Sequence, residues 1–439
     1  MALAPGLRRL KTLHLTNAWH SSSGGIGTFY RALLEAAEQE EHEMRLVVPG
    51  DRTRVENIGR FCRIYHIEAP RAPLNRNYRM IYPYRFLFPR TALQRILNDE
   101  QPDLVEVSEK YTMPYLAGLL RTRRLPGVRV RPAVVGLSCE RMDENFSAYL
   151  SQNPGGRKFC RWYMKWIYFP MFDHHVTVSE HVAEELIAAS HGHKVRRGVW
   201  IEPMGVDYQR FGHARPDPQL RRSMLGGDPP QGAENATLLL YAGRLAPEKN
   251  LPLLVETMAL LDPLHFRLAV AGSGMERERL EAEFARRGMR NVVFLGHVGD
   301  RDRLAGLFAS ADVFLHPNPR EPFGIAPLEA MAAGLALVAP RSGGVISYAD
   351  QSNSWLADPT GAAFAAAARS IRDNPPAATQ KRIAARATAA RHDWPHVTKR
   401  YLNLYRELNA LTQGQCASAN TRPRIWSTAG DAFGRETGA

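Results

Sequence analysis

The sequence lacks long apolar runs and paired cysteines, and each absence excludes a class of protein. No run of about 18 apolar residues occurs among the 439, so we predict no segment that spans a bilayer. The N-terminal MALAPGLRRLK has no long apolar stretch behind its basic residues, so we predict no secretory signal. Cys62, Cys139, Cys160 and Cys416 are scattered, which argues against a disulfide framework or a cysteine metal site and favours a cytoplasmic location.

Acidic residues are fewer than basic residues. The chain has 44 Asp and Glu against 57 Lys and Arg, a net charge of +13. An excess of this size favours an acidic partner. Since no recognisable nucleic-acid motif accompanies the charge, we expect no nucleic acid. A phosphorylated small molecule or an anionic membrane surface is the better expectation.

Short, continuous apolar runs alternate with helical patterns along the whole chain. Runs of this kind are typical of parallel strands covered by helices on both faces. They lie at residues 12–15, 44–49, 102–107, 131–137, 174–179, 198–203, 236–243, 266–272, 292–298, 312–317 and 335–340. One set in each half predicts an α/β protein with two doubly wound, Rossmann-like domains.

The domain boundary is expected where a strand ends in glycine and the pattern restarts, near residue 204. We therefore predict a first domain over 1–204 and a second over 205–393. Apolar residues at helical spacing predict a long amphipathic helix over 394–412. The polar, glycine- and alanine-rich stretch 413–439 is expected to be a disordered tail.

Two segments carry weak signals for an anion site. In SSSGGIGTFYRALLEAA (21–37), a loop containing Gly24, Gly25 and Gly27 precedes a helix that we expect to begin near Thr28. Such a loop permits close backbone approach to an anion, or is a tight strand–helix turn. In AGRLAPEKN (242–250), Arg244 and Lys249 follow a strand at the sheet edge where ligands bind. Together they suit a diphosphate; alone they are a solvated pair.

The segment PREPFGIAPLEAMAAGLALVAPRSGG (319–344) is the most specific feature of the sequence. Phe323 and Gly324 open a helix whose first amides, including that of Ile325, are unpaired. Glu321 in the preceding loop can accept hydrogen bonds from sugar hydroxyls, and Glu329 can hold vicinal ribose hydroxyls. A capping role for Glu321 or a surface position for Glu329 explains either residue alone, but not the two together beside this helix start.

These motifs resemble the retaining glycosyltransferases of family 4. The resemblance covers residues 10–410 and implies the GT-B fold, with a cleft between the two domains. It implies that Arg244 and Lys249 bind the donor diphosphate, Glu321 contacts the transferred sugar and Glu329 holds the ribose. It further implies that the helix at 394–412 crosses back to the first domain. The remaining donor-binding positions that it implies are Phe323, Gly324 and Ile325 through their amides, Val298 against the base, and Gly24, Gly25 and Gly27 facing the phosphates or the acceptor.

The sequence departs from this family at one position. Many members place a histidine near the reacting carbon, and the matching residue in VVGLSCERMDE (134–144) is Cys139. A neutral thiol cannot replace the donor and acceptor functions of imidazole. Either Glu140 and Asp143 do part of that work, or the protein is slower than its relatives or inactive. Cys139 is equally well explained as a small buried residue.

Two segments, 76–90 and 157–170, interleave basic and aromatic residues without an acid. In the second, Phe159, Trp162, Trp166 and Phe169 are predicted to share one helical face, opposite Lys158, Arg161 and Lys165. An apolar stripe of this kind is more often part of the core than of a membrane contact. We interpret it as core and keep peripheral membrane docking, which would reach a lipid-linked acceptor, as the alternative.

The sequence therefore predicts a hexosyltransferase that moves sugar from GDP-mannose or a UDP-sugar to a glycan or lipid-linked acceptor. We expect no metal and no cofactor, since cations and helix dipoles can stabilise the departing diphosphate. Two alternatives stay open. The first is a nucleotide-sugar epimerase or hydrolase, and the second is a weakened or non-catalytic nucleotide-sugar-binding protein, which Cys139 favours.

Overall fold

The computed structural model describes residues 9–19, 24–72, 78–88, 90–149, 154–193, 198–227, 233 and 235–414. The chain divides into two compact units. The first contains the residues up to Ser147, Gln152–Glu202 and those from Thr398 onward, and the second consists mainly of Pro203–Val397. Most of the expected tail, 415–439, lies outside the described residues.

The first unit is built on an eight-stranded sheet. Its order is β3-β4-β2-β1-β5-β6-β7-β8, and all neighbours are parallel except β3 and β4, which are antiparallel. The strands are β1 (Lys11–Leu15), β2 (Glu43–Gly50), β3 (Arg54–Asn57), β4 (Cys62–Glu68), β5 (Leu104–Val107), β6 (Ala133–Ser138), β7 (His174–Thr177) and β8 (Val199–Ile201). Strands β3 and β4 were not among the expected runs, because β3 is largely exposed and β4 mixes polar with apolar residues.

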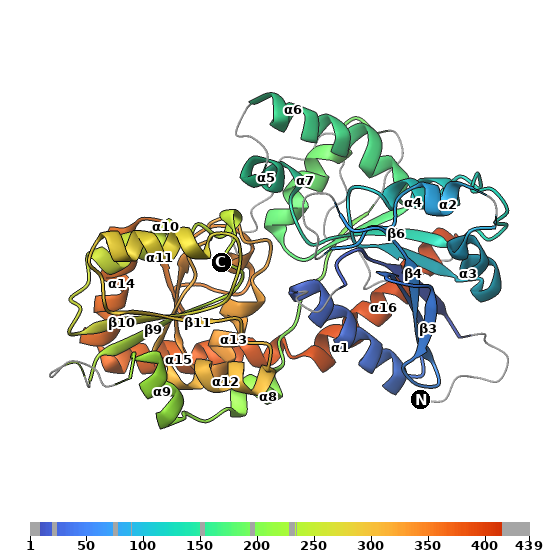
Figure 1. The fold of residues 1–439 in the computed structure, drawn as a ribbon. Coiled ribbons are helices and arrows are strands. Elements are labelled where there is room, and N and C mark those ends of the chain that lie inside the picture. The colour runs from blue at the N-terminus through green and yellow to red at the C-terminus, as the bar shows by residue number, and fades with distance from the viewer. Residues whose placement is uncertain are drawn as a thin grey trace, which may run out of the picture. The chain divides into compact units, whose positions relative to one another are not determined.

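Helices cover both faces of this sheet. Helices α1 and α16 lie on one face, and α4 and α7 on the other (Figure 1). The helical elements are α1 (Gly25–Gln39), α2 (Tyr84–Leu87), α3 (Ala92–Glu100), α4 (Pro114–Arg121), α5 (Met142–Tyr149), α6 (Pro154–Tyr163), η1 (Met164–Tyr168), η2 (Phe169–Met171), α7 (Glu180–Ser190) and α16 (Trp394–Thr412). Buried Glu106 on β5 accepts hydrogen bonds from Tyr30 of α1 at 2.9 Å and Tyr405 of α16 at 2.5 Å, and these bonds fix the C-terminal helix to the sheet.

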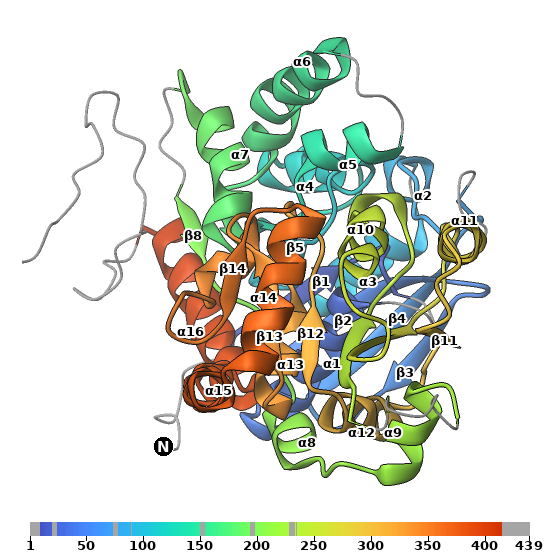
Figure 2. The same cartoon turned by 90° about the vertical axis from the view of Figure 1, so that its left-hand side faces the viewer.

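The second unit has a six-stranded parallel sheet in the order β11-β10-β9-β12-β13-β14. Its strands are β9 (Thr237–Ala242), β10 (Phe266–Ala271), β11 (Val292–Gly296), β12 (Val313–Leu315), β13 (Ala336–Pro340) and β14 (Trp355–Ala357). Figure 2 shows β14, β13 and β12 following one another across the sheet. Two parallel α/β sheets, each with its own core, confirm the predicted fold class; the short strand β14 was missed.

Helices also cover both faces of the second sheet. Helices α10 and α14 lie on one face, and α12, α13 and α15 on the other (Figure 1). The helical elements are α8 (Tyr208–His213), α9 (Pro218–Met224), η3 (Pro247–Lys249), α10 (Pro252–Ala259), α11 (Arg277–Arg286), α12 (Arg301–Ser310), α13 (Ile325–Ala333), η4 (Gly344–Ser347), α14 (Gly361–Asp373) and α15 (Pro375–Arg391). The doubly wound arrangement leaves the loops after β9 and β12 at one edge of the sheet, which is where the sequence motifs fall.

The aromatic stripe of the first unit is not core. The side chains of Phe159, Trp162 and Trp166 are 50%, 51% and 54% exposed, whereas Phe169 is buried. Our core interpretation was therefore wrong for three of the four residues. Phe159 and Trp162 lie in α6, whose buried side is formed instead by Cys160 and Tyr163; the π-helical turn η1, which follows α6, affects the placement of Phe169. Because a π turn holds more residues than an α turn, it rotates the next residues about the helix axis and carries Phe169 to the inner side.

The other basic and aromatic segment lies partly outside the described residues, which omit positions 73–77 and 89. Of its aromatic side chains, Phe86 is buried and Phe88 is exposed. The placement of Phe86 agrees with a core role for that residue alone.

Candidate active site

An ion pair stands at the sheet edge of the second unit. Lys249 ends the short helix η3 that follows β9, and Glu321 lies in the loop between β12 and α13. The Lys249 ammonium contacts both carboxylate oxygens of Glu321, Oε1 at 3.1 Å and Oε2 at 2.8 Å. Residues that are 72 positions apart in the sequence are thus brought together, as the motifs predicted.

The surroundings of Glu321 keep its carboxylate ionised. Burial alone would raise the pKa of Glu321, but the charge of Lys249 and hydrogen bonds from Lys249 and Asn318 outweigh it and lower that pKa to about 2. Asn318 donates to Oε2 at 3.0 Å, and the Nε2 atom of His316 lies 4.0 Å from the same oxygen. Burial lowers the pKa of His316 to about 4, so this ring is neutral at pH 7.

Asn318 and His316 were not recognised from the sequence. Both are buried polar residues placed directly after the apolar strand β12. That position is the signal that would have found them, since polar side chains at the carboxyl end of a parallel strand face the ligand edge.

Arg244 does not join the Lys249–Glu321 pair. Its guanidinium contacts Glu248 at 2.8 Å, and its side chain is 54% exposed. Tyr241 donates a hydrogen bond to the backbone oxygen of Arg244 at 2.9 Å, which holds the loop after β9. Each of the two residues expected to bind the diphosphate therefore contacts a carboxylate.

The start of helix α13 presents free backbone donors. Gly324 caps the helix with φ +91°, a left-handed conformation that favours glycine. Within the described residues, the amides of Phe323, Gly324 and Ile325 have no hydrogen-bond acceptor. Because the helix dipole adds positive potential at the same place, these amides suit an anion.

Glycines later in the motif hold this helix start in place. The amide of Gly344 donates to the backbone oxygen of Glu321 at 2.6 Å, and a Cβ at position 344 would fall 1.9 Å from the oxygen of Pro322. Tyr348 donates to the oxygen of Gly324 at 2.6 Å. The SGG sequence that closes the motif is therefore a packing requirement of the Glu321 loop.

Glu329 lies in the middle of α13 and is 4% exposed, so it is not a surface charge. Its Oε1 atom accepts a hydrogen bond from Arg301 at 2.7 Å. Burial raises the pKa of Glu329, and the charge of Arg301 opposes that rise.

Val298, the residue expected to face the base, comes two positions after Gly296, the last residue of β11. Val298 is partly buried in the loop that leads to α12. Two aspartates in Asp-x-Asp spacing, Asp300 and Asp302, follow it, and the expectation of no metal did not take this pair into account. Asp300 caps α12 by accepting from the amides of Asp302 and Arg303, and Asp302 contacts Arg210 at 2.7 Å.

In the first unit, the glycine segment starts its helix earlier than expected. Helix α1 begins at Gly25 rather than near Thr28, so Gly25 and Gly27 lie in its first turn. The amide of Thr28 already donates to the oxygen of Gly24, which shows that the first turn is closed there. A Cβ on Gly24 would meet nothing within 4 Å, so packing within the described residues does not require glycine at this position.

Cys139 lies directly after β6 and is partly exposed. Loss of hydration around its sulfur, followed by the negative charges of Glu106 and Glu140, raises the pKa of this thiol well above its usual value. The residue is therefore a neutral thiol at pH 7 and not a nucleophile. Glu140 beside it accepts hydrogen bonds from Asn145 at 2.6 Å and Tyr111 at 3.4 Å.

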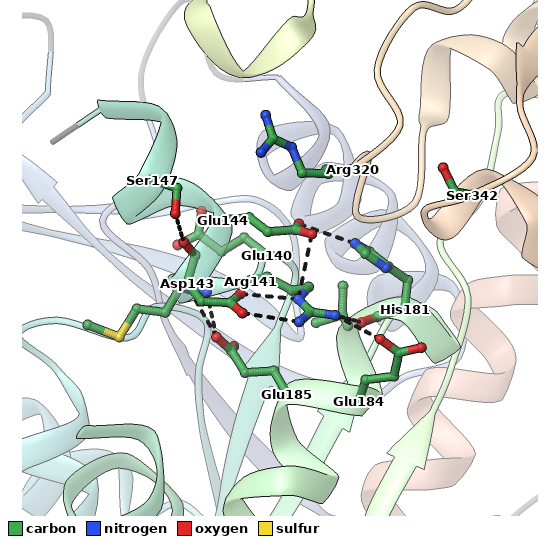
Figure 3. Close-up of polar contacts among 12 residues, drawn as sticks. Glu140, Arg141, Asp143, Glu144, Ser147, His181, Glu184, Glu185, Arg320 and Ser342 are labelled. Carbon is green, nitrogen blue, oxygen red and sulfur yellow. Dashed lines mark hydrogen bonds and ion pairs between the residues drawn. The ribbon is translucent and has the colours of Figure 1, made fainter. Parts of the chain in front are cut away.

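The loop after Cys139 is held by a cluster of charges, shown in Figure 3. Arg141 lies among carboxylates and contacts Asp143 at 3.2 Å and Glu184 at 2.9 Å. Burial would raise the pKa of Asp143, but its bond to Arg141 lowers that pKa, so this carboxylate stays charged. Glu185 accepts from the amides of Met142 and Asp143 and forms a buried ion pair with Lys110 at 2.6 Å. Asp143 is thus engaged in holding the loop.

Comparison with known proteins identifies the class of protein that shares this architecture. A family model described as glycosyl transferases group 1 matches residues 229–389, and one described as glycosyltransferase family 4 matches residues 23–210. Sucrose-phosphate synthase from Thermosynechococcus elongatus has the same fold, with a TM-score of 0.71, 20% identity and coverage of 92% of this chain and 100% of that one. WaaG, a glycosyltransferase involved in lipopolysaccharide biosynthesis, superposes with a TM-score of 0.63 and 17% identity over 90% of this chain and 99% of that one. The fold is that of the GT-B glycosyltransferases.

Sequence relatives narrow the class to a family. A GDP-mannose-dependent alpha-(1-6)-phosphatidylinositol dimannoside mannosyltransferase of Mycobacterium tuberculosis is 30% identical over 370 residues, 83% of this chain and 88% of that protein. A GDP-mannose-dependent alpha-mannosyltransferase of Corynebacterium glutamicum is 24% identical over 348 residues, 79% and 76% of the two chains. The chain belongs to the group 1, family 4 glycosyltransferases, as its motifs indicated.

The Lys249–Glu321 pair generates a prediction for the pH dependence of stability. Because the pKa of Glu321 is lowered from 4.5 to about 2, the pair stabilises the fold above pH 4.5 and loses that contribution as the pH falls towards 2. Lys249→Met should therefore lower the free energy of unfolding by about 3 kcal/mol at pH 6 and by less at pH 3. Urea unfolding followed by fluorescence at both pH values measures the difference.

Arg279→Met is the matched control, since the Arg279 side chain is 78% exposed in its pair with Glu276 and a surface pair contributes little. An equal loss for Lys249→Met at both pH values would show that the pair does not hold Glu321 ionised.

Proposed function

We propose that this protein transfers mannose from GDP-mannose to a lipid-linked or glycan acceptor, with retention of configuration and without a metal ion. The Lys249–Glu321 pair beside the free amides of α13 carries the proposal. GDP-mannose is favoured over a UDP-sugar because relatives at 30% and 24% identity over most of their length are GDP-mannose-dependent.

The geometry supports separate roles along the donor. The Lys249 ammonium and the amides of Gly324 and Ile325 would stabilise the negative charge that develops on the departing diphosphate. Glu321 would accept hydrogen bonds from sugar hydroxyls, and Glu329 would hold the ribose. A bound diphosphate would give the Lys249 ammonium a second anionic partner beside Glu321. Arg244, which is more exposed, would swing from Glu248 to the diphosphate.

The chemical step needs no protein nucleophile. The bond between the sugar C1 and the diphosphate oxygen breaks, and a bond between C1 and the acceptor oxygen forms on the same face. The acceptor's proton passes to the departing diphosphate oxygen. Cys139 takes no part in this proton transfer, because its thiol is neutral.

The location that we propose for this reaction is the cytoplasm. The three free cysteines among the described residues are compatible with that reducing compartment.

Turnover assays test this assignment. GDP release should require both GDP-mannose and an acceptor, and should continue in the presence of EDTA. Glu321→Ala and Lys249→Ala should each lower the rate at least about tenfold, since each removes a charge that stabilises the transition state. Arg279→Ala, an exposed residue on α11, is the control.

Each alternative has its own outcome in this assay. GDP release without acceptor would indicate a hydrolase, an epimerised donor an epimerase, and binding without turnover a nucleotide-sugar-binding protein. Full activity of both site variants would show that the site is misplaced. A gain in rate for Cys139→His would show that the missing imidazole is costly.

We further propose that the first unit docks on an anionic membrane surface, where a lipid-linked acceptor resides. No helix within the described residues has the length and apolar character needed to cross a bilayer. The exposed rings of Phe159, Trp162 and Trp166 support docking, because amphipathic aromatics of this kind favour the membrane interface. Phe159 and Trp162 stack at 6.1 Å, and the Lys165 ammonium lies 5.1 Å from the Trp166 ring centre, which places a cation among the aromatics.

Vesicle binding tests the docking surface. Combining Trp162→Ser with Trp166→Ser should lower partitioning into vesicles of anionic phospholipid at least about tenfold, because two large apolar side chains lose their burial. Arg161→Ala with Lys165→Ala should weaken it by about 1 kcal/mol for each charge. Ile383→Ser, which removes an equally exposed apolar side chain of the second unit, is the control. If both double variants partition into the vesicles as the unaltered protein does, the proposal of membrane docking is wrong.

A further inference from the structure

Glu329 depends on a residue outside its own motif. Arg301, the first residue of α12, donates a hydrogen bond to Glu329 Oε1 at 2.7 Å, although 28 positions separate the two in sequence. We propose that Arg301 is a positioning residue for the nucleoside of the donor: it fixes one oxygen of Glu329 so that the other can hold the ribose. This inference rests on the proposed ribose role of Glu329.

Arg301 is itself held in place. Its guanidinium carbon lies 5.0 Å from the ring centre of Phe211, a cation–π contact. Phe211 is fully buried on α8, and its ring packs edge-on against Phe308 of α12 at 5.4 Å. A guanidinium fixed on a buried ring has little freedom to turn away, so the direction of its hydrogen bond to Glu329 is set by the core.

Arg301 contacts only one of the two carboxylate oxygens of Glu329. Arg301 reaches Oε1, and no hydrogen bond to Oε2 of Glu329 is found in the part of the chain that the structure describes. A bidentate pair would occupy both oxygens, whereas this one leaves an acceptor for a hydroxyl. Vicinal hydroxyls of a ribose are donors of the required kind.

Burial makes the pairing necessary. A carboxylate that is 4% exposed is costly to keep charged, and its burial raises the pKa of Glu329. Asp207, the cap of α8, adds a repulsive charge, although Arg210 neutralises part of it at 2.6 Å. Arg301 contacts Glu329 directly, and its charge lowers the pKa of that carboxyl against the larger rise that burial causes.

Steady-state kinetics of four single variants and one double variant test the proposal. Arg301→Gln should raise the KM for GDP-mannose about tenfold while kcat changes less than about twofold, because a bond to a charged acceptor is lost away from the reacting carbon. Arg301→Lys should recover part of that loss, since it restores the charge without the fork of the guanidinium. Arg303→Gln, on the same helix and without a contact to Glu329, should behave like the unaltered protein.

The Glu329→Gln variant separates this inference from the proposed function. If it leaves the KM unchanged, the ribose role fails and Arg301 loses its function with it. If it raises the KM while Arg301→Gln does not, only the positioning role is overturned. The double variant gives a second test of the positioning role. If Arg301→Gln raises the KM by the same factor in the Glu329→Gln protein as in the unaltered protein, Arg301 does not act through Glu329 and the positioning role is overturned. A fall in kcat equal to the rise in KM would indicate a general structural role instead.

Discussion

The contact between the Lys249 ammonium and both carboxylate oxygens of Glu321 is the interaction on which the proposed donor site of the second unit depends. It joins the loop after β9 to the loop after β12 and fixes a positive and a negative group a few ångströms apart. The charge of Lys249 and its hydrogen bond to Glu321 lower the pKa of that carboxyl against the rise that burial would cause. The chemistry proposed for the site needs both charges, one for the diphosphate and one for the sugar.

Pairing of opposite charges recurs at this edge. Arg244 contacts Glu248, and Arg301 contacts Glu329, so both of these cations have an acid beside them. The net charge of +13 is therefore not concentrated in a preformed anion pocket among these side chains. Instead, the donor's own negative charge and the unpaired amides at the start of α13 would reorganise the pairs on binding.

Much of the fold can be predicted from the sequence, because strands such as β9 and β13 are buried on both sides and read as continuous apolar runs. Strand β4 was missed because its exposed face interrupts the run. The exposure of Trp162 was missed because helical spacing shows which residues share a face but not which face meets the core, and here that face carries Cys160 and Tyr163. At the candidate site, Lys249, Glu321 and Glu329 were singled out through their motifs, and their roles in donor binding stay predictions. Arg301 was not singled out, since its contact with Glu329 spans 28 residues and no local pattern records it.

The most direct test of the central claim is a crystal structure of the protein with GDP bound. The account predicts diphosphate oxygens within hydrogen-bonding distance of the Lys249 ammonium and of the amides of Gly324 and Ile325, with the ribose hydroxyls on Glu329. A diphosphate bound elsewhere on the second unit, with Lys249 and Glu321 still in contact only with each other, would contradict it.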